Sequence, residues 1–136
     1  FRLLSRQVKS KLVDVCTWDS GSFEWYEGFE NPRQAFPLDL DPFEMLGAGA
    51  MALPESTVMS WAERVAHARP RAARNPAVSV DVLGAGDWGK RAMDVLGQTS
   101  TVWELASRYA SMAERLQFLR ALYLLVFADI AILDGL

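Results

Sequence analysis

Three glycines in the stretch GAGDWG offer the clearest chemical signal in this sequence. Gly84, Gly86 and Gly89 match G-x-G-x-x-G, the spacing at which a βαβ unit holds a dinucleotide pyrophosphate against a helix N-terminus. The apolar run VSVDVL precedes them, and Glu104 follows about twenty residues after Gly84, where a ribose-binding carboxylate is expected. These residues define one hypothesis, a dinucleotide-binding, Rossmann-like fragment of an NAD(P)-dependent oxidoreductase.

The surrounding residues favour a turn over a cofactor site. VSVDVL is interrupted by Ser79 and Asp81, whereas the first strand of a Rossmann sheet is buried on both faces and is usually continuously apolar. Glu104 stands three residues after Thr101, which is typical of a capping box at the start of a helix. The residues after Gly89 continue as two helices and one short strand, too little for a βαβαβ half. We therefore interpret the glycines as turn residues and predict no cofactor.

No other catalytic or metal-binding group stands out in the sequence. The single cysteine, Cys16, and the single histidine, His67, cannot form a Cys/His metal cluster. Cys16 lies in an apolar row and is expected to be a small buried hydrophobic residue. Glu24, Glu27 and Glu30 are typical of a solvent-facing strand and loop. These observations predict a domain that is not an enzyme.

Composition limits the class of protein further. The chain has 136 residues, of which 51% are hydrophobic, and this is enough for a compact core. A net charge of -3 is not the bulk charge of a protein that binds nucleic acid or anionic membranes. The most apolar stretch, 121–128, is too short to cross a membrane, so no membrane insertion is expected. A single cysteine fits a reducing, cytoplasmic compartment, and a start at Phe1 without a leader fits a piece cut from a longer protein.

Hydrophobic periodicity and capping residues predict an α+β fold that is mostly helical with a few short antiparallel strands. Small residues in the helix after Asp41 are expected to allow close helix packing, despite their cost in helix propensity. Helices are predicted at 1–14, after Asp41, at 55–66, at 87–96, from Thr101 and at 112–127, and strands at 23–25 and 130–133.

Residues 68–76, ARPRAARNP, are rich in arginine and proline. We interpret them as a solvated linker between two segments, 1–67 and 77–136.

Several landmarks of the first segment occur in the order found in a known family. Trp18, Gly21, Phe23 and Trp25 match W-x-x-G-x-F-x-F, PLDL at 37–40 matches I-P-L-D-L, and Gly49 and Trp61 match later positions. Residues 1–67 thereby resemble the C-terminal half of PATAN-type (PatA N-terminal) domains, although the family's D-E-W region is Val-Met-Ser-Trp here. Residues 77–136 more distantly resemble the small winged-helix-like helical segment that often follows.

The resemblance implies a non-catalytic protein-interaction or regulatory module of a bacterial multidomain signalling protein. Such a module has a protein partner, and a homo-oligomer is left open. The aromatic residues of the first motif, Trp18, Phe23 and Trp25, are expected in the core. Aromatic residues near the prolines are candidates for an exposed protein-binding patch, namely Tyr26, Phe29 and Phe36.

A third hypothesis is winged-helix DNA binding through residues 87–133. The helix 112–127 would be the recognition helix, with Arg115, Gln117 and Arg120 beside the acidic Glu114. The acidic net charge of the chain places this hypothesis last.

Overall fold

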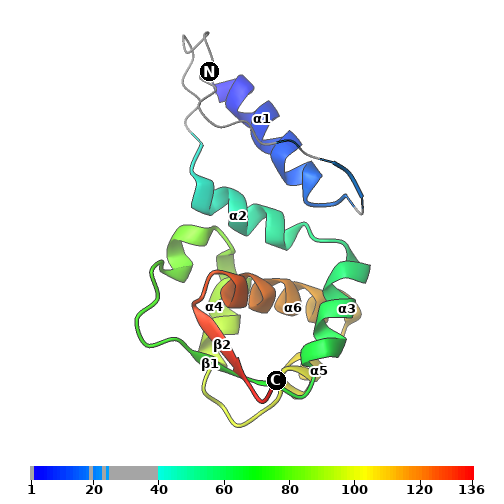
Figure 1. Cartoon of the computed structure of the whole chain (residues 1–136), viewed down its shortest axis with the longest axis vertical. Coiled ribbons are helices and arrows are strands. Elements are labelled where there is room, and N and C mark those ends of the chain that lie inside the picture. The colour runs from blue at the N-terminus through cyan, green and yellow to red at the C-terminus, as the bar shows by residue number, and fades with distance from the viewer. Residues whose placement is uncertain (1, 19, 23, 25–39) are drawn as a thin grey trace.

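The computed structural model describes residues 2–18, 20–22, 24 and 40–136. In this part of the chain the protein is mostly helical with two short strands, so the predicted α+β class is confirmed (Figure 1). The elements in chain order are α1 (Arg2–Val15), α2 (Pro42–Met51), α3 (Glu55–Val65), β1 (Arg69–Ala72), the 3₁₀ helix η1 (Val80–Leu83), α4 (Gly86–Asp94), α5 (Val102–Ser107), α6 (Met112–Phe127) and β2 (Ala131–Asp134).

Helix α6 is the centre of the fold and contacts α2, α3, α4, α5 and β2 (Figure 1). Its buried residues lie on more than one face of the helix, because Phe118, Leu124 and Leu125 are buried as well as Leu119 and Leu122. A helix that is apolar on most sides must be enclosed by other elements. Helices α2, α3, α4 and α5 therefore pack around α6, whereas α1 packs against α2.

The two strands pair antiparallel, with Arg69 opposite Asp134 and Ala72 opposite Ala131. Strand β1 lies inside the segment 68–76, so the linker interpretation is wrong for Arg69–Ala72. Pro70 is fully buried, and its carbonyl oxygen accepts a hydrogen bond from the amide of Gly97 at 3.0 Å. Proline is tolerated here because the sheet has two strands, both of them edges.

One hydrophobic cluster joins residues from both sides of the segment 68–76. Helix α3 contributes the face that its periodicity predicts, with Val58, Trp61, Ala62 and Val65 all buried. Leu83, Phe118 and Leu122 are among the largest fully buried side chains on the other side. The two predicted segments therefore share a core in the described part of the chain.

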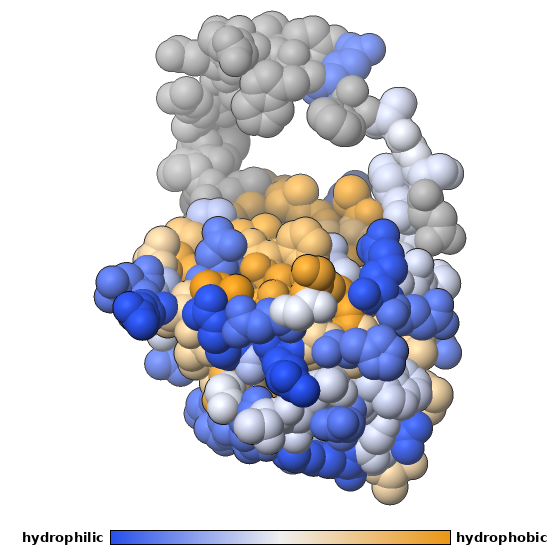
Figure 2. Space-filling model, turned by 60° about the horizontal axis from the view of Figure 1, so that its bottom comes forward, coloured by the Kyte–Doolittle hydropathy of each residue, from blue (hydrophilic) through white to orange (hydrophobic). Residues whose placement is uncertain are grey.

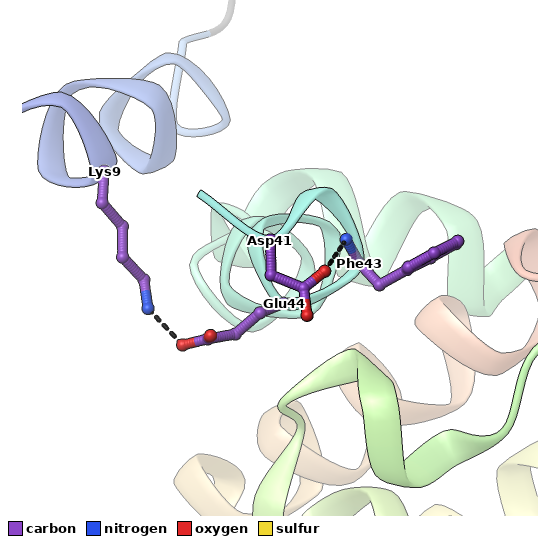
Figure 3. A network of polar contacts seen from close by, with 4 residues as sticks. All are labelled: Lys9, Asp41, Phe43 and Glu44. Atoms are coloured by element: carbon purple, nitrogen blue, oxygen red, sulfur yellow. Dashed lines mark hydrogen bonds and ion pairs between the residues drawn. The ribbon is translucent and has the colours of Figure 1, made fainter. Parts of the chain in front are cut away.

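The helix ends follow the predicted capping residues. The side chain of Asp41 accepts a hydrogen bond from the amide of Phe43 at 2.9 Å, and Pro42 occupies the first turn of α2 (Figure 3). Thr101 and Glu104 form a capping box at α5, with N···O distances of 3.3 and 3.1 Å. These local signals determine where α2 and α5 begin.

Helix α1 departs from the expected pattern. It has no buried residue, and Leu12 and Val15 are each 47% exposed. Cys16, expected to be buried, is only partly so. Trp18 is 59% exposed, so its assignment to the core is wrong.

The predicted strand at 23–25 and the other two aromatic residues of its motif, Phe23 and Trp25, lie outside the described residues, as do the three binding candidates Tyr26, Phe29 and Phe36.

Candidate functional site

The glycine-rich loop forms a tight turn, as its turn interpretation predicts. Gly84 has φ 64° and Gly86 has φ 59°, in the left-handed region that glycine adopts at little cost. Gly89 is buried inside α4, where an added Cβ would lie 2.9 Å from the Cβ of Ala85 and 3.1 Å from a methyl carbon of Val80. The three glycines therefore serve turning and close packing.

The strand that a dinucleotide-binding unit requires before its glycines is a 3₁₀ helix here. The hydroxyl of Ser79 caps η1 by accepting a hydrogen bond from the amide of Asp81 at 3.2 Å. Glu104, the candidate ribose ligand, accepts a hydrogen bond from the amide of Thr101 in the α5 capping box. The strand–turn–helix context of the dinucleotide hypothesis is therefore wrong.

A small hollow of about 350 Å³ lies at the glycine loop. Its lining includes Gly84, Gly86, Asp81 and Lys90. The carboxylate and the ammonium group are of opposite charge, so they give the hollow little net attraction for a pyrophosphate. The hollow by itself therefore does not indicate an anion site.

The side chains that a DNA-recognition helix would need are partly buried and make hydrogen bonds within the fold. Arg115 donates a hydrogen bond to the carbonyl oxygen of Tyr109 at 2.8 Å, and Arg120 donates one to that of Leu53 at 2.9 Å. A second nitrogen of Arg120 binds the side chain of Gln117 at 3.2 Å. Since these groups fasten α6 to its neighbours, they do not form a free basic surface.

A cavity of about 650 Å³ lies between α1, α2 and the C-terminal end of α6. We call it the α1–α2–α6 cleft. Its walls are almost entirely apolar; among the described residues that line it, Cys16 and Tyr123 are the ones that carry a thiol or a hydroxyl group. The residues that characterise it are Leu12 of α1 and Cys16 just after that helix, Met45 and Leu46 of α2, and Tyr123 and Phe127 of α6.

Two glycines of α2 fix the geometry of this cleft. A Cβ added at Gly47 would lie 1.3 Å from the carbonyl oxygen of Leu83 in η1. A Cβ added at Gly49 would lie 2.6 Å from the sulfur of Cys16 at the end of α1. Residues two apart project from nearly opposite sides of a helix, so α2 fits closely between η1 and α1. The expected role of small residues in close packing is confirmed.

An aromatic series connects the core to the cleft. The rings of Trp61 and Tyr123 meet edge to face with centroids 5.2 Å apart, and those of Tyr123 and Phe127 stack at 4.3 Å. Trp61 is only 5% exposed, whereas Phe127 is 64% exposed. The cleft wall at Phe127 is thus supported by the partly buried ring of Tyr123 and, behind it, by the buried ring of Trp61.

Three of the exposed large hydrophobic side chains, Leu12, Leu46 and Phe127, line the cleft. Leu46 is 60% exposed and, with Phe127, presents apolar surface at the cleft. Among the described residues, most of the exposed large hydrophobic side chains lie on α1 and the residues just after it, on α2 or at the end of α6, namely Leu3, Leu4, Leu12, Val15, Trp18, Phe43, Leu46 and Phe127. Figure 2 shows that apolar surface gathers in one band of the molecule, bordered by hydrophilic side chains. Such gathering is typical of an interaction site.

An ion pair between Lys9 of α1 and Glu44 of α2 stands at the side of the cleft (Figure 3). Both side chains are well exposed, at 39% and 51%, so the pair contributes little to stability. It does fix which side of α1 faces the first turn of α2. Leu12 and Cys16, on the same side of α1 as Lys9, are thereby turned toward the cleft.

The described residues hold few groups that could carry acid–base or metal chemistry. Among them there is no cluster of three or more His, Cys, Asp or Glu side chains able to hold a metal ion, and no buried polar or charged residue. No helix among them has the length and apolar character needed to cross a membrane. The cleft is therefore suited to binding apolar groups by shape and hydrophobic contact.

Comparison with known proteins finds no matching family model, curated protein or solved structure. The resemblance to PATAN-type domains stays a prediction from the motifs. The sequence pointed to aromatic residues near the prolines, whereas the structure brings together Leu12, Leu46 and Phe127. In the sequence, these three residues belong to amphipathic helix patterns. Such patterns are equally typical of core residues, so they did not identify the cleft.

Proposed function

We propose that this chain is a non-catalytic protein-interaction module of a bacterial multidomain signalling protein, and that its partner binds in the α1–α2–α6 cleft. The observation that carries the proposal is the cleft itself, an apolar hollow of about 650 Å³ bordered by exposed side chains. The net charge of -3 supports a protein partner over a nucleic acid. The lone free cysteine supports a cytoplasmic location.

The exposed apolar side chains of the cleft would contribute to the binding free energy when a partner covers them. Fully burying a leucine or phenylalanine side chain contributes about 1.5 to 3 kcal/mol. Leu46 and Phe127 are 60% and 64% exposed, so covering them contributes about 1 to 2 kcal/mol each. Fewer than about a third of interface residues contribute more than about 1 kcal/mol. Covering Leu46 and Phe127 would therefore supply a clear part of a partner's affinity.

Site-specific photocross-linking in cells tests the proposal. The photoreactive analogue benzoylphenylalanine is placed at Leu46 or Phe127, and in control chains at Trp103 or Met112, which are 46% and 49% exposed away from the cleft. We expect the two cleft positions to cross-link to the same protein and the control positions to leave that protein unlabelled. The purified partner should then bind the chain and lose affinity about tenfold or more with Leu46→Asp.

Two results would contradict the proposal. One is equal labelling of the same proteins from the cleft and from the control positions. The other is a purified partner that binds the Leu46→Asp chain as tightly as the unchanged chain, provided that circular dichroism shows the same helix content in both.

A further inference from the structure

Helix α1 carries an apolar stripe that the described part of the molecule leaves uncovered. Leu4, Val8, Leu12 and Val15 follow the helical spacing, and such a stripe normally faces a core. No residue of α1 is buried, and Leu4, Leu12 and Val15 are 44%, 47% and 47% exposed. Leu12 also lines the cleft, so the stripe and the cleft meet at this residue.

The same helix is strongly basic in an acidic chain. It carries four basic residues, Arg2, Arg6, Lys9 and Lys11, and one acidic residue, Asp14. The chain as a whole has a net charge of -3. Lys9 is paired with Glu44. Arg2, Arg6 and Lys11 are exposed and make no hydrogen bond or ion pair within the part that the structure describes. The surface beside the stripe is therefore positive.

We propose that the occupant of this surface is an acidic amphipathic helix of a partner protein. The inference rests on the proposed function and specifies the partner. Helices α1 and α6 form the two sides of the cleft and α2 lies between them, which suits a helix laid with its apolar face inward. Acidic residues flanking that face would complement the positive side chains of α1, steering the encounter and setting its orientation.

The shape of the surface favours a helix over a lipid bilayer. A basic amphipathic helix that lies on a membrane presents its apolar face outward to a flat surface. Here the apolar face of α1 borders a hollow whose other walls carry Leu46 and Phe127. A convex helix fills such a hollow, and a bilayer does not.

Two synthetic peptides test the chemistry of the partner. Both are amphipathic helices of about 18 residues, roughly five turns, with leucine at i, i+3, i+4 and i+7, and they differ only in carrying glutamate or lysine at the flanking positions. Fluorescence anisotropy measures their binding to the full chain. We expect the acidic peptide to bind at least about tenfold more tightly than the basic one, and to weaken as salt is raised.

Matched charge variants locate the binding surface. Arg2→Glu with Lys11→Glu should weaken binding of the acidic peptide about tenfold, as expected for two exposed ion contacts at the strong end of their range. Arg74→Glu with Lys90→Glu changes the net charge by the same amount elsewhere and should leave the affinity within about twofold. Circular dichroism should show equal helix content in both variants.

Several outcomes would overturn the inference. Equal affinity for the two peptides would show that charge does not select the partner, and equal weakening in the two double variants would place the contact away from α1. Sedimentation with phosphatidylserine vesicles that is lost with the α1 variant, without binding of the acidic peptide, would assign the surface to a membrane. A dimer that the α1 variant dissociates would assign it to a second copy of the chain.

The cross-linking experiment separates failure of this inference from failure of the proposed function. If the acidic peptide does not bind while Leu46 and Phe127 still cross-link to one protein, the partner chemistry is wrong and the interaction module stands. If neither the peptide nor a cellular protein is bound at the cleft, both are wrong.

Discussion

Replacing Gly47 with alanine tests the close approach of α2 and η1, on which the position of the cleft depends. The added Cβ would lie 1.3 Å from the carbonyl oxygen and 2.5 Å from the carbonyl carbon of Leu83. Ordinary contact begins at 3.4 Å, so the two backbones must separate by roughly 2 Å. Leu83 is fully buried, and its backbone cannot turn aside as an exposed side chain would.

Two opposing effects determine how much Gly47→Ala changes the free energy of unfolding. Alanine is favoured over glycine inside a helix by about 1 kcal/mol. Overpacking a well-packed interior costs about 1 to 3 kcal/mol, and the upper end applies because backbone atoms must move. We therefore expect Gly47→Ala to lower the free energy of unfolding by about 2 kcal/mol. For a chain of this length that corresponds to a fall in Tm of about 8 °C.

Urea unfolding followed by circular dichroism measures the free energy, and differential scanning calorimetry measures Tm. The matched control is Gly49→Ala combined with Cys16→Ala, which makes the same glycine-to-alanine change in the same helix after removing the sulfur atom in its way. The control should be no less stable than Cys16→Ala alone. A Gly47→Ala chain as stable as the unchanged protein would refute the close packing of α2 against η1.

Three further predictions address the neighbouring features. Gly49→Ala alone should destabilise the chain less than Gly47→Ala, because the added Cβ would lie 2.6 Å from a side-chain sulfur, that of Cys16. Adding Cys16→Ala should then restore stability. Additive effects of the two substitutions in a double-mutant cycle would count against this contact. Thr101→Ala removes one half of the α5 capping box and should cost about 1 kcal/mol by urea unfolding, whereas an unchanged midpoint would mean that the hydrogen bond to the amide of Glu104 is not maintained in solution. NAD, NADH, NADP and NADPH should each leave Tm unchanged, because a 3₁₀ helix stands before the glycines in place of a strand and Asp81 lines their hollow. A bound cofactor at a hundred times its Kd would raise the free energy of unfolding by about 2.7 kcal/mol. A clear rise in Tm would therefore restore the dinucleotide hypothesis.

Sequence reasoning succeeded where the signal is local. At the start of α2, the side chain of Asp41 accepts a hydrogen bond from an amide of the first turn, and the side chain of Thr101 does the same at the start of α5. In both helices the two residues are only two or three positions apart. The helix at 112–127 has an apolar pattern long enough to predict a helix that packs against the core. Such features need no knowledge of the rest of the chain.

It failed where distant residues decide the outcome. Arg69–Ala72 has the composition of a linker, and it is a strand because Ala131–Asp134 is available to pair with it. A proline in a short arginine-rich run has low strand propensity, so only the partner strand and the burial of Pro70 make it one.

The cleft could not be predicted because it joins three elements far apart in the chain, and its residues look like core residues. An amphipathic stripe shows which side of a helix avoids water, but it does not show what covers that side. In α3 the stripe is covered by α6, and Trp61 is buried. In α1 the stripe has the same pattern, and Leu12 stays 47% exposed beside the cleft. The same sequence signal thus leads to a core in one helix and to an open apolar surface in the other, and the open surface is what a binding partner would cover.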